Sequence, residues 1–564
     1  MTRWRARAEV GLAIAVVGLP IVVATARARV RHWFPMGDNA YFTIRAHDVL
    51  TEHHPLVGAW SSGSASVGVE VNNLGPLQID LLAAPVRLLG AGPGTAVGVA
   101  AVNLLASASV VVLLHRRLGS LGTWVGAAAA AATAWTLGSE LLFEPRQHHA
   151  LVLPFLAFLV ATAAAAAGER WALPVALAWG SLAAQTHLTF AVPVALLVVG
   201  AAVALLAGRV AGWRPGWGRG PWLASAAVVL VLWVQPLIEE LGAGEGNLSA
   251  LRRAATADQQ PYGVARALRA TAEVLLPPSG WWRGSFRAFD PVGGTPPLPA
   301  ALAGLALALG LLGGVGWWAR RRRDRPVAAL AGVAGAAVVA GVLGAARSPV
   351  DGPFGAVPGN FRFLWPIGAL LAAALVVGAL RAAPRPTQAR APAVLAMLSL
   401  VLAVAALPTS YQSPGPEADA PLIPVARSLV DQLDEVDLPS PVRFERGDLY
   451  FGEPFTYVVV WGLVHAGVDV VFEDPVDLAR FGDERAPDQN PPVVVVVTLL
   501  GGDAALEAPA AEVLARASLL RPAEQEELAR LRALSELSPA EEARRDDLLD
   551  RHRRGTVAVV SSPP

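Results

Sequence analysis

The sequence predicts a mainly helical membrane protein, with about eleven transmembrane spans over residues 1–408 and an α/β domain over residues 409–564. Hydrophobic residues make up 54% of the chain, charged residues 16%, and mean hydropathy is +0.47. These values depart from a globular average in the direction that a bilayer demands. Charge divides the chain at the same place: residues 1–408 carry 31 basic and 17 acidic side chains, and residues 409–564 carry 14 and 28. This pattern excludes a soluble cytosolic enzyme and a nucleic-acid-binding protein.

Apolar runs long enough to cross roughly 30 Å of hydrocarbon recur along the first part of the chain. The predicted spans are 9–25, 94–114, 121–139, 149–167, 171–185, 187–208, 221–238, 298–318, 326–345, 361–380 and 391–408. The fifth run is short and abuts the sixth at Gln185-Thr186-His187, so that boundary is the least defined. Because the chain has no cysteine, disulfides and thiolate metal sites are excluded.

Arginine placement predicts the orientation of these spans. Arginines precede the first span and follow the second, fourth, sixth, eighth and tenth, including Arg320–Arg323 after the eighth. By the positive-inside rule this side is cytoplasmic, together with the N-terminus. An odd number of spans then places residues 409–564 outside. A cleaved signal peptide ending near Ala24-Thr25-Ala26 is the alternative for the first span.

Two predicted outer loops, 27–93 and 239–297, are much longer than a helix reversal needs, so we expect function on this face. In the second loop, Trp281-Trp282-Arg283 and Arg287 are typical of an aromatic belt or of a wall of an acceptor groove.

Residues 409–564 alternate in the manner of a soluble α/β unit. We expect helices at 424–436, 454–466, 475–481 and 522–554, and strands at 441–444, 468–472, 492–498 and 556–560. Gly501-Gly502-Asp503 is predicted to be a turn, since no phosphate-binding loop pattern surrounds it. This domain is expected to cover the outer mouth of the bundle and to help select the acceptor.

The most informative stretch is Pro35-Met36-Gly37-Asp38-Asn39-Ala40-Tyr41, about a dozen residues after the first span. Asp38 stands at the expected start of a helix, where an ordinary N-cap role is the alternative to a functional one. Further on, Asn72-Asn73-Leu74-Gly75-Pro76-Leu77 leads into the second span, and its Gly-Pro turn is expected to set the angle of entry. A helix lying in the membrane interface is the alternative interpretation.

One span, an acid just beyond it, two surface helices and a multi-span bundle together resemble the GT-C superfamily of integral-membrane glycosyltransferases, which includes oligosaccharyltransferases and aminoarabinose transferases. The resemblance implies a GT-C-like fold in a bacterial plasma membrane and a polyprenyl-phosphate-linked sugar donor. It also implies an extracytoplasmic reaction with a glycan, lipid or protein acceptor. The superfamily's acid in the first outer loop maps onto Asp38. Asp38-Asn39 stands where protein O-mannosyltransferases show Asp-Glu, which argues against that branch.

Chemistry supports Asp38 independently of the resemblance. Glycosyl transfer needs a base that takes the proton of the acceptor hydroxyl, and it needs positive charge to hold the leaving phosphate. Asp38 is therefore the predicted catalytic base. Asn39 and Arg45, on the same segment, are predicted to bind substrate.

Three further places are predicted to line the site. The loop Glu144-Pro145-Arg146-Gln147-His148 places Glu144 and His148 four residues apart, as on one helical face, and allows a divalent cation, Mg²⁺ or Mn²⁺. A solvated interfacial turn is the alternative. His187 lies at a span end, where a snorkelling side chain is the alternative. Arg362 opens the tenth span, where phosphate or a lipid headgroup would compensate its charge.

A transporter or flippase of lipid-linked sugars has a similar hydropathy profile and is the competing function. A transporter favours internal repeats and polar residues at mid-span depth, whereas here polar residues gather at the outer span ends. A noncatalytic membrane anchor would need neither eleven spans nor the Asp38 loop.

Overall fold

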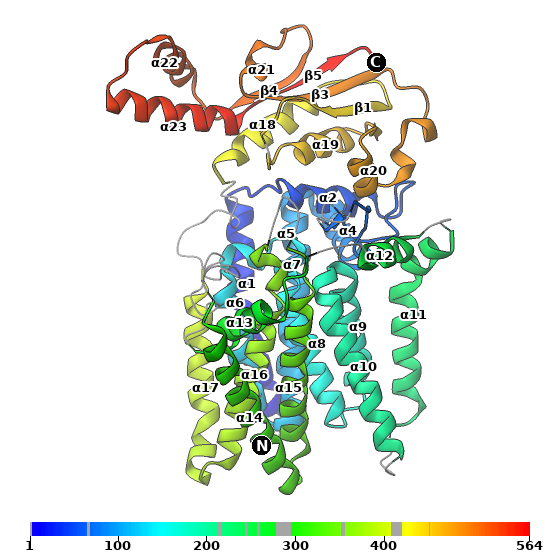
Figure 1. The fold of residues 1–564 in the computed structure, drawn as a ribbon, viewed down its shortest axis with the longest axis vertical. Coiled ribbons are helices and arrows are strands. Elements are labelled where there is room, and N and C mark those ends of the chain that lie inside the picture. Colours follow the sequence, from blue (N-terminus) through cyan, green and yellow to red (C-terminus); the bar gives the residue numbers. More distant parts are fainter. Residues whose placement is uncertain are drawn as a thin grey trace. The chain divides into compact units, whose positions relative to one another are not determined.

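The structure is a computed structural model with two compact units (Figure 1). Unit 1 comprises Met1–Ala28, Leu56–Gln78 and Ala96–Tyr411, and unit 2 comprises Arg29–Pro55, Ile79–Thr95 and Gln412–Pro564. The structure describes residues 3–61, 63–64, 68–210, 217–242, 246–256, 260–277, 295–350, 356–407, 420–450 and 452–564. Trp281, Trp282, Arg283 and Arg287, for which an aromatic belt or groove wall was predicted, lie outside the described residues.

Unit 1 is a helix bundle. Its long helices are α1 (Arg3–Val30), α5 (Ala91–Leu118), α6 (Ser120–Leu137), α8 (Val152–Ala166), α9 (Ala172–Thr186), α10 (Leu188–Val210), α11 (Arg219–Gly242), α14 (Leu298–Arg321), α15 (Arg325–Ala346), α16 (Leu364–Ala382) and α17 (Arg385–Ala405). Shorter helical elements are η1 (Ser139–Leu142), α7 (Gln147–Ala150), α12 (Asn247–Thr256), α13 (Val264–Leu275) and η4 (Pro358–Phe361). The first residues of α5 and the last two of α1 belong to unit 2.

Each of the eleven predicted spans is helical, but eight helices among the described residues are long and apolar enough to cross a membrane. By this criterion eight of the eleven predicted spans qualify. Of the other three, α9 has only 15 residues, α6 is an alanine-rich helix of 18 residues, and α10 is apolar over Leu188–Val203, the part whose side chains the structure describes. The chain is a multi-pass membrane protein.

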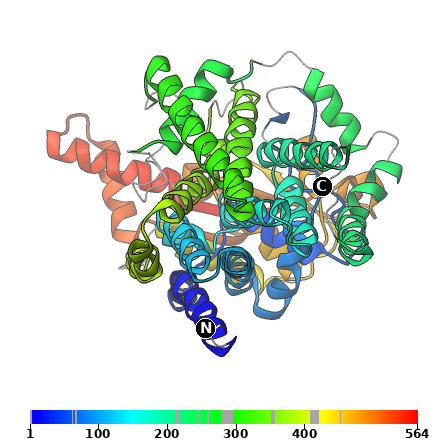
Figure 2. The ribbon, with the colours of Figure 1, turned by 90° about the horizontal axis from the view of Figure 1, so that it is seen from below.

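Burial distinguishes the centre of the bundle from its rim. The helices α8 and α16 are largely buried, whereas α11, α14 and α17 expose most of their apolar surface, as helices facing lipid do. The helix α1 lies at the rim (Figure 2) and packs through Ala13 and Val17 against Ala127 and Ala131 of α6. Small side chains at such contacts let helix backbones approach closely.

Unit 2 is built on a mixed five-stranded sheet in the order β2-β1-β3-β5-β4. Its strands are β1 (Val442–Arg446), β2 (Val470–Val471), β3 (Val495–Gly501), β4 (Val513–Ser518) and β5 (Thr556–Ser562). β1 pairs in parallel with β2 and β3, whereas β5 is antiparallel to β3 and β4. The first five residues of β5 are buried, because this strand lies inside the sheet.

Most predicted elements of this region are present. The helices are α18 (Ile423–Leu433), α19 (Thr456–His465), α20 (Pro475–Phe481), α21 (Gly502–Glu507), α22 (Pro522–Ala533) and α23 (Pro539–Gly555), with short turns η5 (Ala420–Leu422), η6 (Asp483–Arg485) and η7 (Pro487–Gln489). The expected turn at Gly501–Asp503 is wrong, since α21 starts there, and β4 was not predicted. The single helix expected over 522–554 is two helices. Ser538 accepts a hydrogen bond from the Glu541 N–H and begins α23.

Unit 2 also contains two segments from the first predicted outer loop. The helix α2 (Asp38–Asp48) begins at Asp38, as predicted, and packs against α19. Most of α4 (Leu77–Leu89) belongs to the same unit. The segment that carries Asp38 is therefore folded together with residues that lie more than 400 positions later in the chain.

Candidate functional site

Asp38 is the first residue of α2, and its side chain is exposed. Gly37 occupies the N-cap position with φ of 52°, a left-handed conformation that glycine adopts without strain. The alternative N-cap role for Asp38 is therefore wrong, because the cap residue is Gly37 and no side chain caps the helix. A carboxylate in the first helical turn lies in the favourable field of the peptide dipoles.

The two other candidates on α2 are buried. Asn39 is 2% exposed and Arg45 is 5% exposed. Arg45 Nη1 donates to Asp48 Oδ2 at 2.9 Å, to the Phe481 carbonyl at 2.6 Å and to the His53 carbonyl at 3.3 Å. Since these acceptors belong to the protein, the structure places Arg45 as a support of α2. A direct substrate contact by Asn39 or Arg45 stays a prediction.

The other candidates come together in unit 1 and form what we call the Glu144 cluster. Its members are Glu144, Arg146, His148, His149, His187 and Arg362. Glu144, His149 and Arg362 are fully buried. The Glu144 carboxylate accepts a hydrogen bond from His149 Nδ1 at 2.5 Å and lies 3.8 Å from Arg146 Nε. Its charge also acts on the Arg362 guanidinium.

The rings of the cluster stand edge to face. The His148 ring centroid lies 4.3 Å from that of His149 and 6.0 Å from that of His187. The Arg362 guanidinium stacks over Trp365, 3.5 Å from the ring centroid. The cluster residues lie at the ends of helical elements, around η1, α7, η4 and the break between α9 and α10. The sequence had named five of these six residues without linking them.

His149 is the member that sequence reasoning missed. The expected Glu144–His148 pair assumed four-residue spacing on one helix, but α7 spans only Gln147–Ala150 and Glu144 precedes it. The Glu144 carboxylate therefore bonds to His149. His148 packs so closely beside Gly359 that a Cβ at position 359 would lie 2.7 Å from His148 Nε2. The adjacent histidines were the available signal: four-residue spacing pointed to His148, whereas the hydrogen bond to Glu144 comes from His149.

The donor set of the Glu144 cluster fits an anion better than Mg²⁺ or Mn²⁺. Hard divalent cations take several oxygen ligands, whereas among the side chains that the structure describes this cluster offers one carboxylate, bonded to His149 and close to two guanidinium groups. Arginine side chains match the oxygens of a phosphate. Within the described ranges, Glu52, His53 and Asp469 of unit 2 have metal-compatible spacing, with ligand atoms within 4.8 Å of one another. In this second group, the positively charged Arg485 Nη1 also lies 3.8 Å from the Asp469 carboxylate.

A hydrogen-bonded turn holds the Glu144 cluster in place. Asn73 Oδ1 accepts from the Leu188 N–H at 2.9 Å, and Asn73 Nδ2 donates to the Ala59 carbonyl at 2.7 Å. Gln78 Nε2 donates to the Pro145 carbonyl at 2.5 Å. The segment that the sequence singled out for its Gly-Pro turn thus fixes the residues next to His187 and next to Glu144.

We expect Asn73→Ala to lower the free energy of unfolding of the protein by about 1–3 kcal/mol, since it removes the side-chain hydrogen bonds to the buried Ala59 carbonyl and to the half-buried Leu188 N–H. Thermal unfolding in detergent measures the loss. Asn72→Ala is the matched control, because Asn72 bonds to Asn247 through its main chain. Equal losses for both variants would contradict the assigned role of Asn73.

No protein-family model and no curated protein sequence matches the chain. Among solved structures, the chain is similar to ArnT from Cupriavidus metallidurans bound to undecaprenyl phosphate, with 14% identity and a TM-score of 0.49 over 99% of this chain and 98% of that one. It is also similar to the apo oligosaccharyltransferase of Archaeoglobus fulgidus, with 12% identity and a TM-score of 0.39 over 88% and 70%. These two structures are GT-C membrane glycosyltransferases, the superfamily that the sequence motifs resemble. Because both TM-scores lie below 0.5, we build the functional proposal on the residues of this chain.

Proposed function

We propose that the protein is a membrane glycosyltransferase that moves a sugar from a polyprenyl-phosphate-linked donor to a cell-envelope glycan, lipid or protein acceptor. The observation that carries this proposal is the Glu144 cluster. A fully buried arginine and a nearly buried one, Arg362 and Arg146, lie together at helix ends of a membrane bundle. Their positive charge and bidentate donors suit the oxygens of a phosphate.

Asp38 completes the proposed chemistry as the base. The acceptor oxygen forms a bond to the anomeric carbon while the bond from that carbon to the phosphate oxygen breaks. The hydroxyl proton goes to the Asp38 carboxylate, and the electron pair of the broken bond stays on the released polyprenyl phosphate. Arg362 and Arg146 stabilise the charge of the leaving phosphate, and His148 and His187 line the same place.

A transfer assay tests the proposal. We expect the purified full-length chain in lipid nanodiscs to release free polyprenyl phosphate from one member of a panel of polyprenyl-phosphate sugars when acceptor is present. The Asp38→Asn variant should release far less. Movement of the intact donor lipid across proteoliposome membranes, without release of polyprenyl phosphate, would instead support the flippase alternative.

The proposal also requires a definite topology, with the N-terminus cytoplasmic and residues 409–564 outside. We expect accessibility tags at Arg320–Arg323 and at the C-terminus to report opposite sides of the plasma membrane, because arginine-rich loops stay inside. Membrane-impermeant labelling of intact cells measures this. Two tags on the cytoplasmic side would contradict both the odd number of crossings and the extracytoplasmic reaction.

A further inference from the structure

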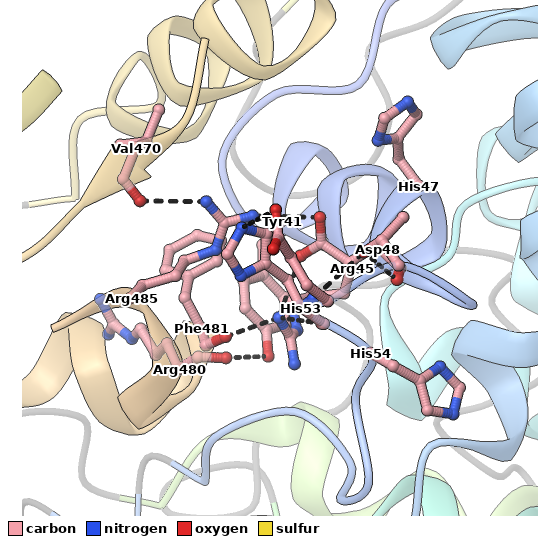
Figure 3. A network of polar contacts seen from close by, with 12 residues as sticks. Tyr41, Arg45, His47, Asp48, His53, His54, Val470, Arg480, Phe481 and Arg485 are labelled. Carbon is pink, nitrogen blue, oxygen red and sulfur yellow. Dashed lines mark hydrogen bonds and ion pairs between the residues drawn. The ribbon is translucent and has the colours of Figure 1, made fainter. Parts of the chain in front are cut away.

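One face of α2 is lined by groups that bond to the C-terminal part of unit 2. Gly37, Tyr41, Arg45 and Asp48 are spaced by four, four and three residues, which places them along a single side of the helix (Figure 3). Apart from Gly37, these residues are buried. Asp38 is exposed and begins the same helix, so whatever fixes this face also fixes the direction in which Asp38 is presented.

The partners of this face form what we call the C-terminal clamp, namely Pro454, Arg480, Phe481 and Arg485. The Pro454 carbonyl accepts from the Gly37 N–H at 2.9 Å. The Arg480 carbonyl accepts from the Tyr41 hydroxyl at 2.9 Å, and the Phe481 carbonyl accepts from Arg45 at 2.6 Å. Since three of the four contacts use main-chain carbonyls, they depend on the local backbone path and not on exposed side chains.

The hydrogen bond of Arg485 to α2 comes from its side chain, a guanidinium. It is 1% exposed, and its Nη2 donates to Asp48 Oδ1 at 3.1 Å while its Nη1 donates to the Val470 carbonyl at 3.0 Å (Figure 3). The Arg485 carbonyl accepts from the Phe472 N–H at 2.9 Å, which ties the residue to the sheet side of the unit. Removal of this guanidinium would leave Asp48 buried beside Arg45 alone.

The surrounding charges close into a circuit. Arg45 bonds to Asp48, Asp48 to Arg485, and Arg485 Nη1 lies 3.8 Å from Asp469. Asp469 accepts from His53 Nε2 at 3.0 Å, and this hydrogen bond holds the pKa of the Asp469 carboxyl below its usual value. The His53 carbonyl accepts from Arg45 and completes the ring. A network of paired charges of this kind favours one arrangement, because a displaced arrangement leaves charges unpaired.

Aromatic packing adds to the clamp close to Asp38. The Tyr41 ring centroid lies 5.4 Å from that of Phe481 and 5.8 Å from that of Tyr457. Burial raises the pKa of the Tyr457 hydroxyl, and the negative charge of Asp38 contributes to the same shift. The exposed carboxylate therefore stands near a layer of rings whose positions are set by residues 457–481.

We propose that the C-terminal clamp sets the position of α2, and that Arg485 is a positioning residue for the Asp38 carboxylate. This inference rests on the proposed role of Asp38 as base. It assigns residues 454–485 to the support of the reacting group, in addition to the acceptor selection expected from the sequence. Arg485 does not touch substrate in this proposal and acts only through Asp48 and α2.

Kinetics and hydrogen exchange of Arg485→Gln in the full-length protein test the proposal. We expect kcat to fall on the order of 10- to 100-fold with the KM for donor changed less than threefold, since a displacement of about 1 Å costs up to 10²-fold. Amide exchange over residues 39–48 should accelerate, whereas exchange in β3 should not. Arg544→Gln, which breaks an ion pair with Glu527 on α22 and α23 of the same unit, is the matched control and should change neither quantity.

A double-variant cycle separates positioning from general destabilisation. If Arg485 acts through Asp38, Arg485→Gln should lower the residual rate of the Asp38→Asn variant less than twofold, because the base it positions is already gone. An equal fold-loss in both backgrounds, or normal exchange in α2, would overturn the proposal.

Two further outcomes are informative. If Arg485→Gln does not fold, Tyr41→Phe removes only the hydroxyl bond to Arg480 and should lower kcat several-fold with the same non-additivity; additive behaviour there would overturn the proposal. If the wild type transfers no sugar from any donor while Arg485→Gln still loosens α2, the proposed function fails and the role of the clamp in fixing α2 stands.

Discussion

Replacement of Asp38 by asparagine is expected to lower sugar transfer by a factor on the order of 10² or more, the scale on which a general base contributes. The side chain is exposed at the first position of α2, and Gly37 serves as the cap, so asparagine fits without a clash. The free energy of unfolding should fall by no more than about 1 kcal/mol, because the side chain is exposed and the favourable interaction of its charge with the helix dipole is of this size.

Measurement of polyprenyl phosphate release and of thermal unfolding on the same preparation checks both parts. Glu435→Gln is the matched control, because Glu435 is an exposed acid of the same unit that belongs to neither the clamp nor the Glu144 cluster. Donor binding by Asp38→Asn should stay near the wild-type value. Wild-type turnover by Asp38→Asn with a working donor and acceptor would contradict the assignment of the base.

Arg362→Met is expected to weaken donor binding by about 10- to 100-fold, since a hydrogen bond to a charged group contributes about 1.5–3 kcal/mol. Stability should fall as well, by about 3–5 kcal/mol, because the Glu144 carboxylate stays buried without this countercharge. Titration of a fluorescent polyprenyl-phosphate lipid, with and without its sugar, measures the affinity change.

A second variant separates the two effects of Arg362. In Glu144→Gln/Arg362→Met both charges are absent, so much of the stability should return while phosphate binding stays weak. Arg347→Gln, at an exposed arginine that ends α15, is the matched control for loss of one positive charge. Recovery of donor affinity in the double variant would show that Arg362 supports the fold and does not hold phosphate.

Hydropathy and short motifs were sufficient to predict most of the helices and strands. Apolar runs define the long helices because a membrane segment must satisfy its backbone internally and cover itself with apolar side chains. Asp38 was correctly predicted to begin a helix, and seven of the eight elements expected in the C-terminal region overlap one helix or strand each. The resemblance to GT-C enzymes also came from local features, namely one span, an acid and a Gly-Pro turn.

Residue periodicity failed where the chain leaves regular structure. The pairing of Glu144 with His149 depends on a short irregular connection before α7, to which four-residue spacing does not apply. Of the predicted spans, α9 and α6 are helical but shorter or less apolar than a full span requires. The strand β4 pairs at a sheet edge and carries Arg516 among its apolar residues, so its alternation is weak.

The sequence by itself determined which segments cross or approach the membrane, and it named Asp38 and five members of the Glu144 cluster. Only the tertiary structure decided that α2 folds together with residues 454–485, that Asn73 braces the connection beside His187, and that Gln78 braces the one beside Glu144. The physical reason is that these contacts join groups more than 60 and up to 437 residues apart, largely through main-chain carbonyls. Every residue type carries such a carbonyl, so local sequence patterns hold no record of which one accepts a given bond.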